Sequence, residues 1–155
     1  MRILNLGSIN IDHVYEVEHF VRPGETLSSS SYKIFAGGKG FNQSIALARA
    51  GAVTCHAGKV GKDADWLIQR LQKEGVNTDC VSVTETATGH AVIQVVPSGE
   101  NAIVLFGGAN QAVTASDVER ALSSCAPGDY LLVQNETSAV PEAIRQGRED
   151  RKSVV

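Results

Sequence analysis

Short apolar runs alternate with amphipathic stretches along the chain. The first run, residues 3–8, lacks the period of two that marks a half-exposed strand, so it predicts a strand covered on both faces. Similar runs predict strands at residues 53–60, 80–83 and 130–133, and residues 152–155 are typical of the start of one more. These runs indicate a buried parallel sheet.

Four stretches carry helical signals and lie between these strands. They are residues 41–50, 62–74, 118–125 and 141–147. Thr114 and Asp117 match the acidic form of a capping box before the third stretch, and Pro141 suits the first turn of the fourth. Strands that alternate with helices of about ten residues predict an α/β fold, in which helices cover both faces of a parallel sheet.

Two segments depart from this alternation of strands and helices. Strand-like pieces at residues 14–20 and 30–35 flank a Pro-Gly turn, and residues 90–105 indicate a hairpin that turns at residues 97–100. We expect a small antiparallel sheet set apart from the main one. Inserted after the first strand, it would stand over the carboxyl ends of the parallel strands, where open α/β sheets bind ligands, and would act as a lid.

Composition narrows the functional classes. The 155 residues suffice for about one domain, and 43% hydrophobic with 20% charged residues is typical of globular proteins. No apolar stretch is long enough to cross a membrane, and a net charge of −3 without charge blocks argues against nucleic-acid binding. Cys55, Cys80 and Cys125 form no CxxC pair, so we expect core residues in a reducing, cytoplasmic compartment rather than a metal site or a disulfide framework.

A glycine-rich turn at residues 37–40 leads directly into the first predicted helix. Its backbone amides could hold an anion or sugar hydroxyls closely. A Walker phosphate loop is excluded because Lys33 and Gly40 occupy its key positions, and a dinucleotide fingerprint is excluded because Gln43 stands where its third glycine belongs. The alternative is a tight turn that leaves Lys39 in solvent.

Polar side chains follow two of the predicted strands. Asn10 and Asp12 come just beyond the first strand and would point to one face if the chain stays extended. Glu136 follows the strand at residues 130–133. Such groups suit bidentate binding of sugar hydroxyls. Alternatively, Asn10 and Asp12 form a turn by bonding their own backbone, and Glu136 is a charge near a helix amino terminus.

In combination, these motifs resemble the amino-terminal half of a PfkB-type, ribokinase-like carbohydrate kinase. The resemblance rests on residues 7–12, 23–26, 37–43, 58–63, 88–89, 107–110 and 134–136. It implies phosphorylation of a sugar hydroxyl with ATP and magnesium, and a lid from about residues 13–36 and 88–106 that also pairs two subunits. It further implies sugar contacts at Asn10, Asp12, Gly37, Gly38, Lys39, Asn42 and Glu136.

The resemblance also implies what residues 1–155 lack. The family's Asn-x-x-Glu motif near magnesium, and its Gly-Ala-Gly-Asp segment with the catalytic base, have no counterpart here. We therefore expect a truncated, sugar-binding half with no catalytic residue or metal ligand of its own, which is inactive alone and binds neither ATP nor magnesium. Its expected partners are a small sugar and a second copy, through the lid or through aggregation at the open sheet edge. The alternatives are a non-catalytic sugar-binding or dimerisation module and an inert remnant.

Overall fold

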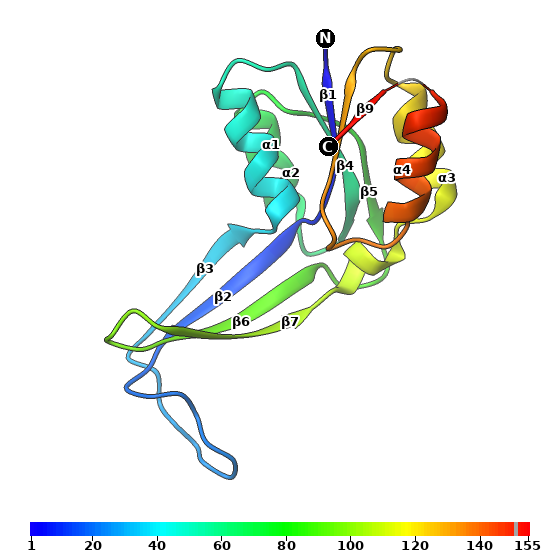
Figure 1. Ribbon diagram of the computed structural model, residues 1–155. Coiled ribbons are helices and arrows are strands. Elements are labelled where there is room, and N and C mark those ends of the chain that lie inside the picture. The colour runs from blue at the N-terminus through cyan, green and yellow to red at the C-terminus, as the bar shows by residue number, and fades with distance from the viewer. Residues whose placement is uncertain (151) are drawn as a thin grey trace.

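A five-stranded parallel sheet forms the centre of the protein in the computed structural model, which describes residues 1–150 and 152–155 (Figure 1). Its strands, in spatial order, are β5 (Asn77–Thr84), β4 (Thr54–Gly61), β1 (Ile3–Leu6), β8 (Tyr130–Val133) and β9 (Ser153–Val154). All four strand pairs are parallel. The apolar run at the start of the chain is therefore the central strand, and the predicted buried strand is confirmed.

Two pairs of helices cover the two faces of this sheet (Figure 1). The first pair is α1 (Lys39–Arg49) and α2 (Asp65–Lys73), and the second is α3 (Ala115–Ser123) and α4 (Val140–Glu149), which a short 3-10 helix η1 (Gly108–Ala112) precedes. Each pair closes its own core: Phe41, Leu67 and Leu71 are buried on one side, and Val118 and Leu122 on the other. The predicted α/β class with helices on both faces is confirmed.

Local signals agree with the observed helix ends. The predicted capping box is present, because the Asp117 amide donates to Thr114 Oγ1 (3.3 Å) and the Thr114 amide donates to the Asp117 carboxylate (2.8 Å). Pro141 lies in the first turn of α4. None of the helices in the described part of the chain combines the length and the apolar character needed to span a bilayer.

A second, four-stranded sheet projects from the carboxyl ends of the parallel strands (Figure 1). Its order is β3 (Ser31–Gly37), β2 (Asn10–Glu16), β6 (Gly89–Val95) and β7 (Asn101–Phe106). The outer pairs are antiparallel, as predicted, but β2 and β6 pair in parallel, so the sheet is mixed. Both strands leave the same end of the main sheet, β2 after β1 and β6 after β5, and therefore run in the same direction.

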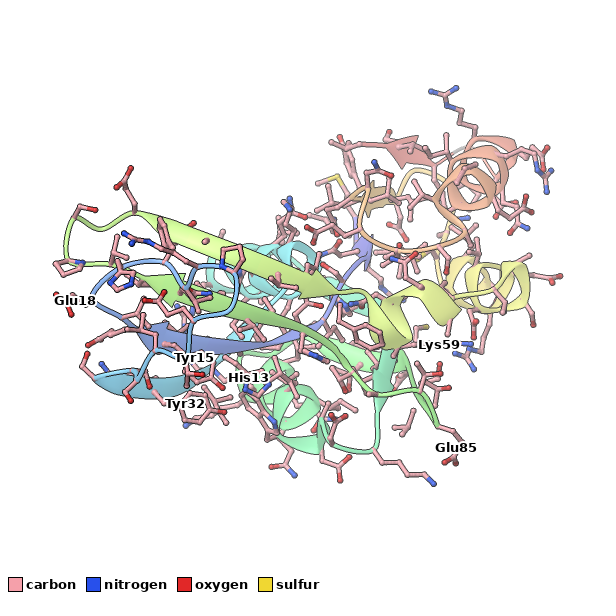
Figure 2. All side chains as sticks on the ribbon, turned by 90° about the horizontal axis from the view of Figure 1, so that it is seen from below. His13, Tyr15, Glu18, Tyr32, Lys59 and Glu85 are labelled. Atoms are coloured by element: carbon pink, nitrogen blue, oxygen red, sulfur yellow. The ribbon has the colours of Figure 1, made fainter. Side chains whose placement is uncertain are left out.

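The two faces of the second sheet differ in chemistry. Strand register places Asp12 on the same face as Ile103 and Leu105, which we call the Asp12 face. The opposite, aromatic face carries His13, Tyr15 and Tyr32 (Figure 2), and ring contacts add His90 and Phe106 to it. The rings of Tyr15 and Tyr32 stack with centroids 4.8 Å apart. Both faces expose large apolar side chains, so neither is a conventional solvated sheet surface.

The three cysteines lie in the core on the α3 and α4 side of the main sheet. Cys55 and Cys80 are buried and Cys125 is half-buried, and all three are free thiols. Burial raises the pKa of the Cys55 thiol to about 12, and neighbouring Cys80 adds to this. Cys55 is therefore an apolar packing residue rather than a nucleophile.

Candidate functional site

Backbone contact between the end of β1 and the start of α1 builds one side of the candidate site. The Phe41 amide donates to the Ser8 carbonyl oxygen (2.9 Å). A Cβ added to Gly40 would lie 2.6 Å from the Gly7 Cα and carbonyl carbon, and equally close to the Ser8 nitrogen. Only a glycine at position 40 lets the two segments approach this closely.

Glu136 joins this junction from the loop after β8. Its Oε2 accepts hydrogen bonds from Ser8 Oγ (2.7 Å) and from the Lys39 backbone amide (3.3 Å), and its Oε1 forms an ion pair with the Lys39 ammonium group. Partial burial alone would raise the pKa of Glu136, but the bonds from Lys39 and Ser8 outweigh it and hold the pKa below its usual value. Glu136 is thus a charged acceptor beside the glycine-rich turn.

Asp12 contributes a second carboxylate from the second sheet. Its side chain lies against Gly37, where a Cβ would overlap the carboxylate, and Gly38 packs against the Ser8 carbonyl oxygen. Burial raises the pKa of Asp12, the His13 imidazole opposes this, and the Glu136 carboxylate adds to it. Two carboxylates, one from the second sheet and one from the loop after β8, therefore lie close enough to interact electrostatically across the turn.

Asn110 fixes the orientation of Asn10. Asn110 is 2% exposed, and its Nδ2 donates to Asn10 Oδ1 (2.7 Å) and to the Ile9 carbonyl oxygen (3.2 Å), while its Oδ1 accepts from the Ile9 amide (3.0 Å). Asn10 Oδ1 is thus occupied, whereas Asn10 Nδ2 makes no hydrogen bond to the described residues, so its N–H groups remain available as donors. The site therefore combines carboxylate acceptors with an amide donor, which suits a polyhydroxylated ligand.

A series of hydrogen bonds between mostly buried side chains stabilises the contact between β1 and α1. Gln134 Nε2 donates to Asn5 Oδ1 (2.8 Å), Asn5 Nδ2 donates to Ser44 Oγ (2.9 Å), and Ser44 Oγ lies 2.8 Å from His56 Nδ1. His56 Nε2 lies 3.2 Å from the Gly7 carbonyl oxygen, which only accepts, so the imidazole carries its proton on Nε2. Burial lowers the pKa of His56 to about 4, which keeps the ring neutral.

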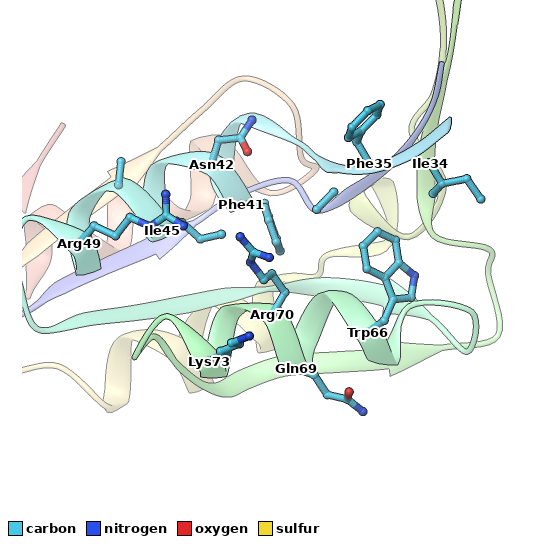
Figure 3. Close-up of a pocket in the computed structure, with 12 residues that line it drawn as sticks. Ile34, Phe35, Phe41, Asn42, Ile45, Arg49, Trp66, Gln69, Arg70 and Lys73 are labelled. Atoms are coloured by element: carbon cyan, nitrogen blue, oxygen red, sulfur yellow. The ribbon is translucent and has the colours of Figure 1, made fainter. Parts of the chain in front are cut away.

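Contacts connect six of the seven sequence-predicted residues: Asn10, Asp12, Gly37, Gly38, Lys39 and Glu136. The seventh, Asn42, is exposed, and its side chain makes no hydrogen bond to the described residues. It lines a separate groove of about 890 Å³ between β3, α1 and α2 (Figure 3). This groove is therefore not where the other predicted residues converge.

Ser8, Asn110 and His56 take part in this arrangement without having been predicted from the sequence as site residues. A usable signal was present for His56, because it is a polar residue inside a run predicted to be a fully buried strand, and such residues must find partners. Asn110 lies 100 residues from Asn10 in the sequence, and only the folded chain connects them.

The donor set of this site fits hydroxyl groups better than a metal ion. Among residues 1–150 and 152–155, no three His, Cys, Asp or Glu side chains gather in a set that could hold a metal. Of the two carboxylates at the turn, Glu136 is paired with the Lys39 cation and Asp12 lies against the backbone of Gly37. We assign no magnesium ligand to these residues.

Comparison with known proteins identifies the family to which this sequence is similar. A family model described as pfkB family carbohydrate kinase matches residues 2–147. The ribokinase of Haemophilus influenzae is 42% identical over 135 residues, which cover 85% of this chain and 44% of that protein. The chain spans about half the length of most of the curated relatives it matches.

Solved structures of ribokinases share the fold of this chain. A ribokinase from Cryptococcus neoformans in complex with ADP aligns with a TM-score of 0.78 at 42% identity, covering 90% of this chain and 44% of that one. An Arabidopsis thaliana ribokinase complexed with ribose and ATP aligns with a TM-score of 0.80 at 28% identity. The alignment covers 99% of this chain and 52% of that one. The family match, the fold and the site geometry lead to one conclusion: the chain belongs to the pfkB family of carbohydrate kinases.

Proposed function

We propose that this chain forms the sugar-binding half of a ribokinase-like kinase and binds a pentose such as ribose at the junction of its two sheets. The observation that carries the proposal is the convergence of Asp12, Asn10 and Glu136 on the glycine-rich turn. Ribose is the first sugar to test because the Arabidopsis relative is described as complexed with it.

Each polar group would have a distinct role. Asp12 and Glu136 would accept hydrogen bonds from sugar hydroxyls, and Asn10 would donate one. The glycine backbone at residues 37–38 would let the sugar ring lie against the chain. Lys39 now neutralises Glu136, so a sugar would bind either beside this ion pair or in exchange for it. Asn42 would join only if its side chain turns away from the groove that it lines.

Replacing Asp12 with alanine is expected to weaken ribose binding by about 10- to 100-fold. The variant removes charge-assisted hydrogen bonds worth about 1.5–3 kcal/mol. Isothermal titration calorimetry on both proteins measures the change. Asp79→Ala on β5, where the Asp79 side chain accepts a hydrogen bond from Asn77, is the control and should bind ribose like the parent. Unchanged affinity in a folded Asp12→Ala protein would refute the assignment of Asp12.

We further propose that these 155 residues alone do not transfer phosphate, because they contain no counterpart of the Gly-Ala-Gly-Asp segment that, by the family resemblance, carries the catalytic base. Loss of a single oxyanion-type donor already costs about a hundred- to a thousandfold in rate, and here the whole set is missing. A coupled assay with ribose and ATP should detect no ribose-dependent ADP. Activity that survives chromatography and disappears in Asp12→Ala would contradict this expectation.

We infer that the second sheet is a lid that pairs two copies through the Asp12 face. Ile103 and Leu105 on this face are each 54% exposed. Ile103→Glu should dissociate a dimer measured by size exclusion with light scattering, because it would bury a charge. The neighbouring Val104 points to the opposite face, so Val104→Glu is the matched control and should stay dimeric. A monomeric parent protein, or open-ended aggregates, would contradict pairing through the lid.

A further inference from the structure

The groove between β3, α1 and α2 has no part in the proposed sugar site apart from Asn42. Its volume is about 890 Å³, which lies within the range of small-molecule pockets. Its lining divides by chemistry: Trp66, Phe35 and Ile34 lie at one end, and Arg49, Arg70 and Lys73 toward the other (Figure 3). The groove is therefore amphipathic, with an apolar end and a cationic end.

The cationic end is organised by one carboxylate. Arg49 donates from Nε and from a terminal nitrogen to the two oxygens of Glu74 (2.7 and 2.6 Å), and Arg70 approaches the same carboxylate at 3.2 Å. Glu74 thus holds two guanidinium groups side by side. Lys73 adds a third cation that forms no ion pair with any described residue. Three cations against one carboxylate leave an excess of two positive charges, with several N–H donors unused.

The apolar end offers the Trp66 indole together with Ile34. Trp66 is 40% exposed and Ile34 is 51% exposed, whereas the Phe35 side chain points away from Trp66 on the other face of β3 (Figure 3). Trp66, Arg70 and Lys73 occupy positions i, i+4 and i+7 of α2, so they lie along one stripe of the helix. At 1.5 Å per residue, Trp66 and Lys73 are separated by about 10 Å.

We infer that this groove binds an organic phosphate, with its ring against Trp66 and Ile34 and its phosphate between Arg49, Arg70 and Lys73. Paired guanidinium groups match phosphate geometry, and an indole face accepts a planar base or the apolar face of a sugar. The two sources of this chemistry are nucleotides and sugar phosphates. The inference goes beyond the proposed sugar site and does not depend on it.

Tryptophan fluorescence provides a direct test because Trp66 is the sole tryptophan of the chain. The full chain is titrated separately with AMP, ribose 5-phosphate, adenosine and inorganic phosphate, with excitation at the red edge of the tryptophan band to avoid absorption by adenine. We expect a saturable change with AMP or ribose 5-phosphate, and weaker binding of adenosine and inorganic phosphate. The organic phosphate that binds more tightly identifies the source.

Charge variants locate the phosphate. Arg70→Gln with Lys73→Gln should weaken binding of the organic phosphate about tenfold or more, whereas Lys62→Gln, which removes an exposed cation paired with Glu85, should not. Asp12→Ala should leave this titration unchanged, which separates it from a failure of the sugar site. The inference is overturned if neither organic phosphate gives a saturable change, if inorganic phosphate binds equally well, or if the Gln variants bind like the parent.

Discussion

Replacing Gly40 with alanine is expected to lower the free energy of unfolding by about 3 kcal/mol. The new methyl group would lie 2.6 Å from backbone atoms of Gly7 and Ser8, and backbone cannot rotate aside as a flexible side chain can. Alanine is favoured over glycine inside a helix by only about 1 kcal/mol, which does not offset the overlap. Urea unfolding followed by circular dichroism measures the difference.

Gly24→Ala is a matched control for this substitution. Gly24 has a positive φ of 77° but no atom within 4 Å of an added Cβ, so its cost is backbone strain alone, about 1 kcal/mol. Gly40→Ala should be clearly the more damaging of the two. A Gly40→Ala protein as stable as Gly24→Ala would mean that α1 can move away from β1 at little cost.

Acidification from pH 7 to pH 4.5 is expected to remove between about 2 and 3 kcal/mol of stability through His56 alone. Burial lowers the pKa of His56 to about 4 in the folded protein, from an ordinary value of 6.5. Between these two values the unfolded chain binds a proton that the folded chain does not, so the free energy of unfolding falls as the pH falls. The raised pKa of Asp12 acts in the opposite direction.

His56→Gln isolates this contribution. Glutamine cannot titrate but can donate to the Gly7 carbonyl oxygen and accept from Ser44. Urea unfolding at pH 7 and at pH 4.5 should show a smaller loss on acidification for His56→Gln than for the parent. His19→Gln, in the loop between β2 and β3 where His19 contacts Glu25, leaves His56 in place and should keep the loss that His56 causes in the parent. An equally steep loss in His56→Gln would assign the acid sensitivity to other groups. Carboxylates such as Glu136, whose pKa is lowered in the folded protein, contribute to the loss of stability mainly below pH 4.5.

The fold was predictable because its signals are local. Apolar runs bounded by glycines mark β1, β4 and β8, and the capping box marks the start of α3. The parallel pairing of β2 with β6 was not predictable from either segment alone, because it depends on where both strands leave the main sheet. The start of β2 at Asn10, instead of residue 14, has the same origin, since pairing with Gly37 and Gly89 extends the strand.

The candidate site was predictable only in part, for a related reason. Asn10, Asp12 and Glu136 stand out because polar residues at strand ends are conspicuous in the sequence. The series of hydrogen bonds that connects Gln134 to His56 joins four polar side chains, and each of them comes from a different element or loop. Sequence spacing carries no information on such partners. Whether the sugar contacts are correct stays a prediction that calorimetry on Asp12→Ala tests.

The mixed second sheet divides the candidate site between two bodies. Asn10 and Asp12 belong to β2 and would travel with that sheet, whereas Lys39 and Glu136 are anchored to α1 and to the loop after β8. Three of the four strands join the main body through at most three residues: β2 through residues 7–9, β3 through Gly38 and β7 through Gly107. These junctions would be the hinges of any opening motion. A ligand that binds both Asp12 and Glu136 would then hold the second sheet against the main body. Part of its binding energy would be used to bring the two together.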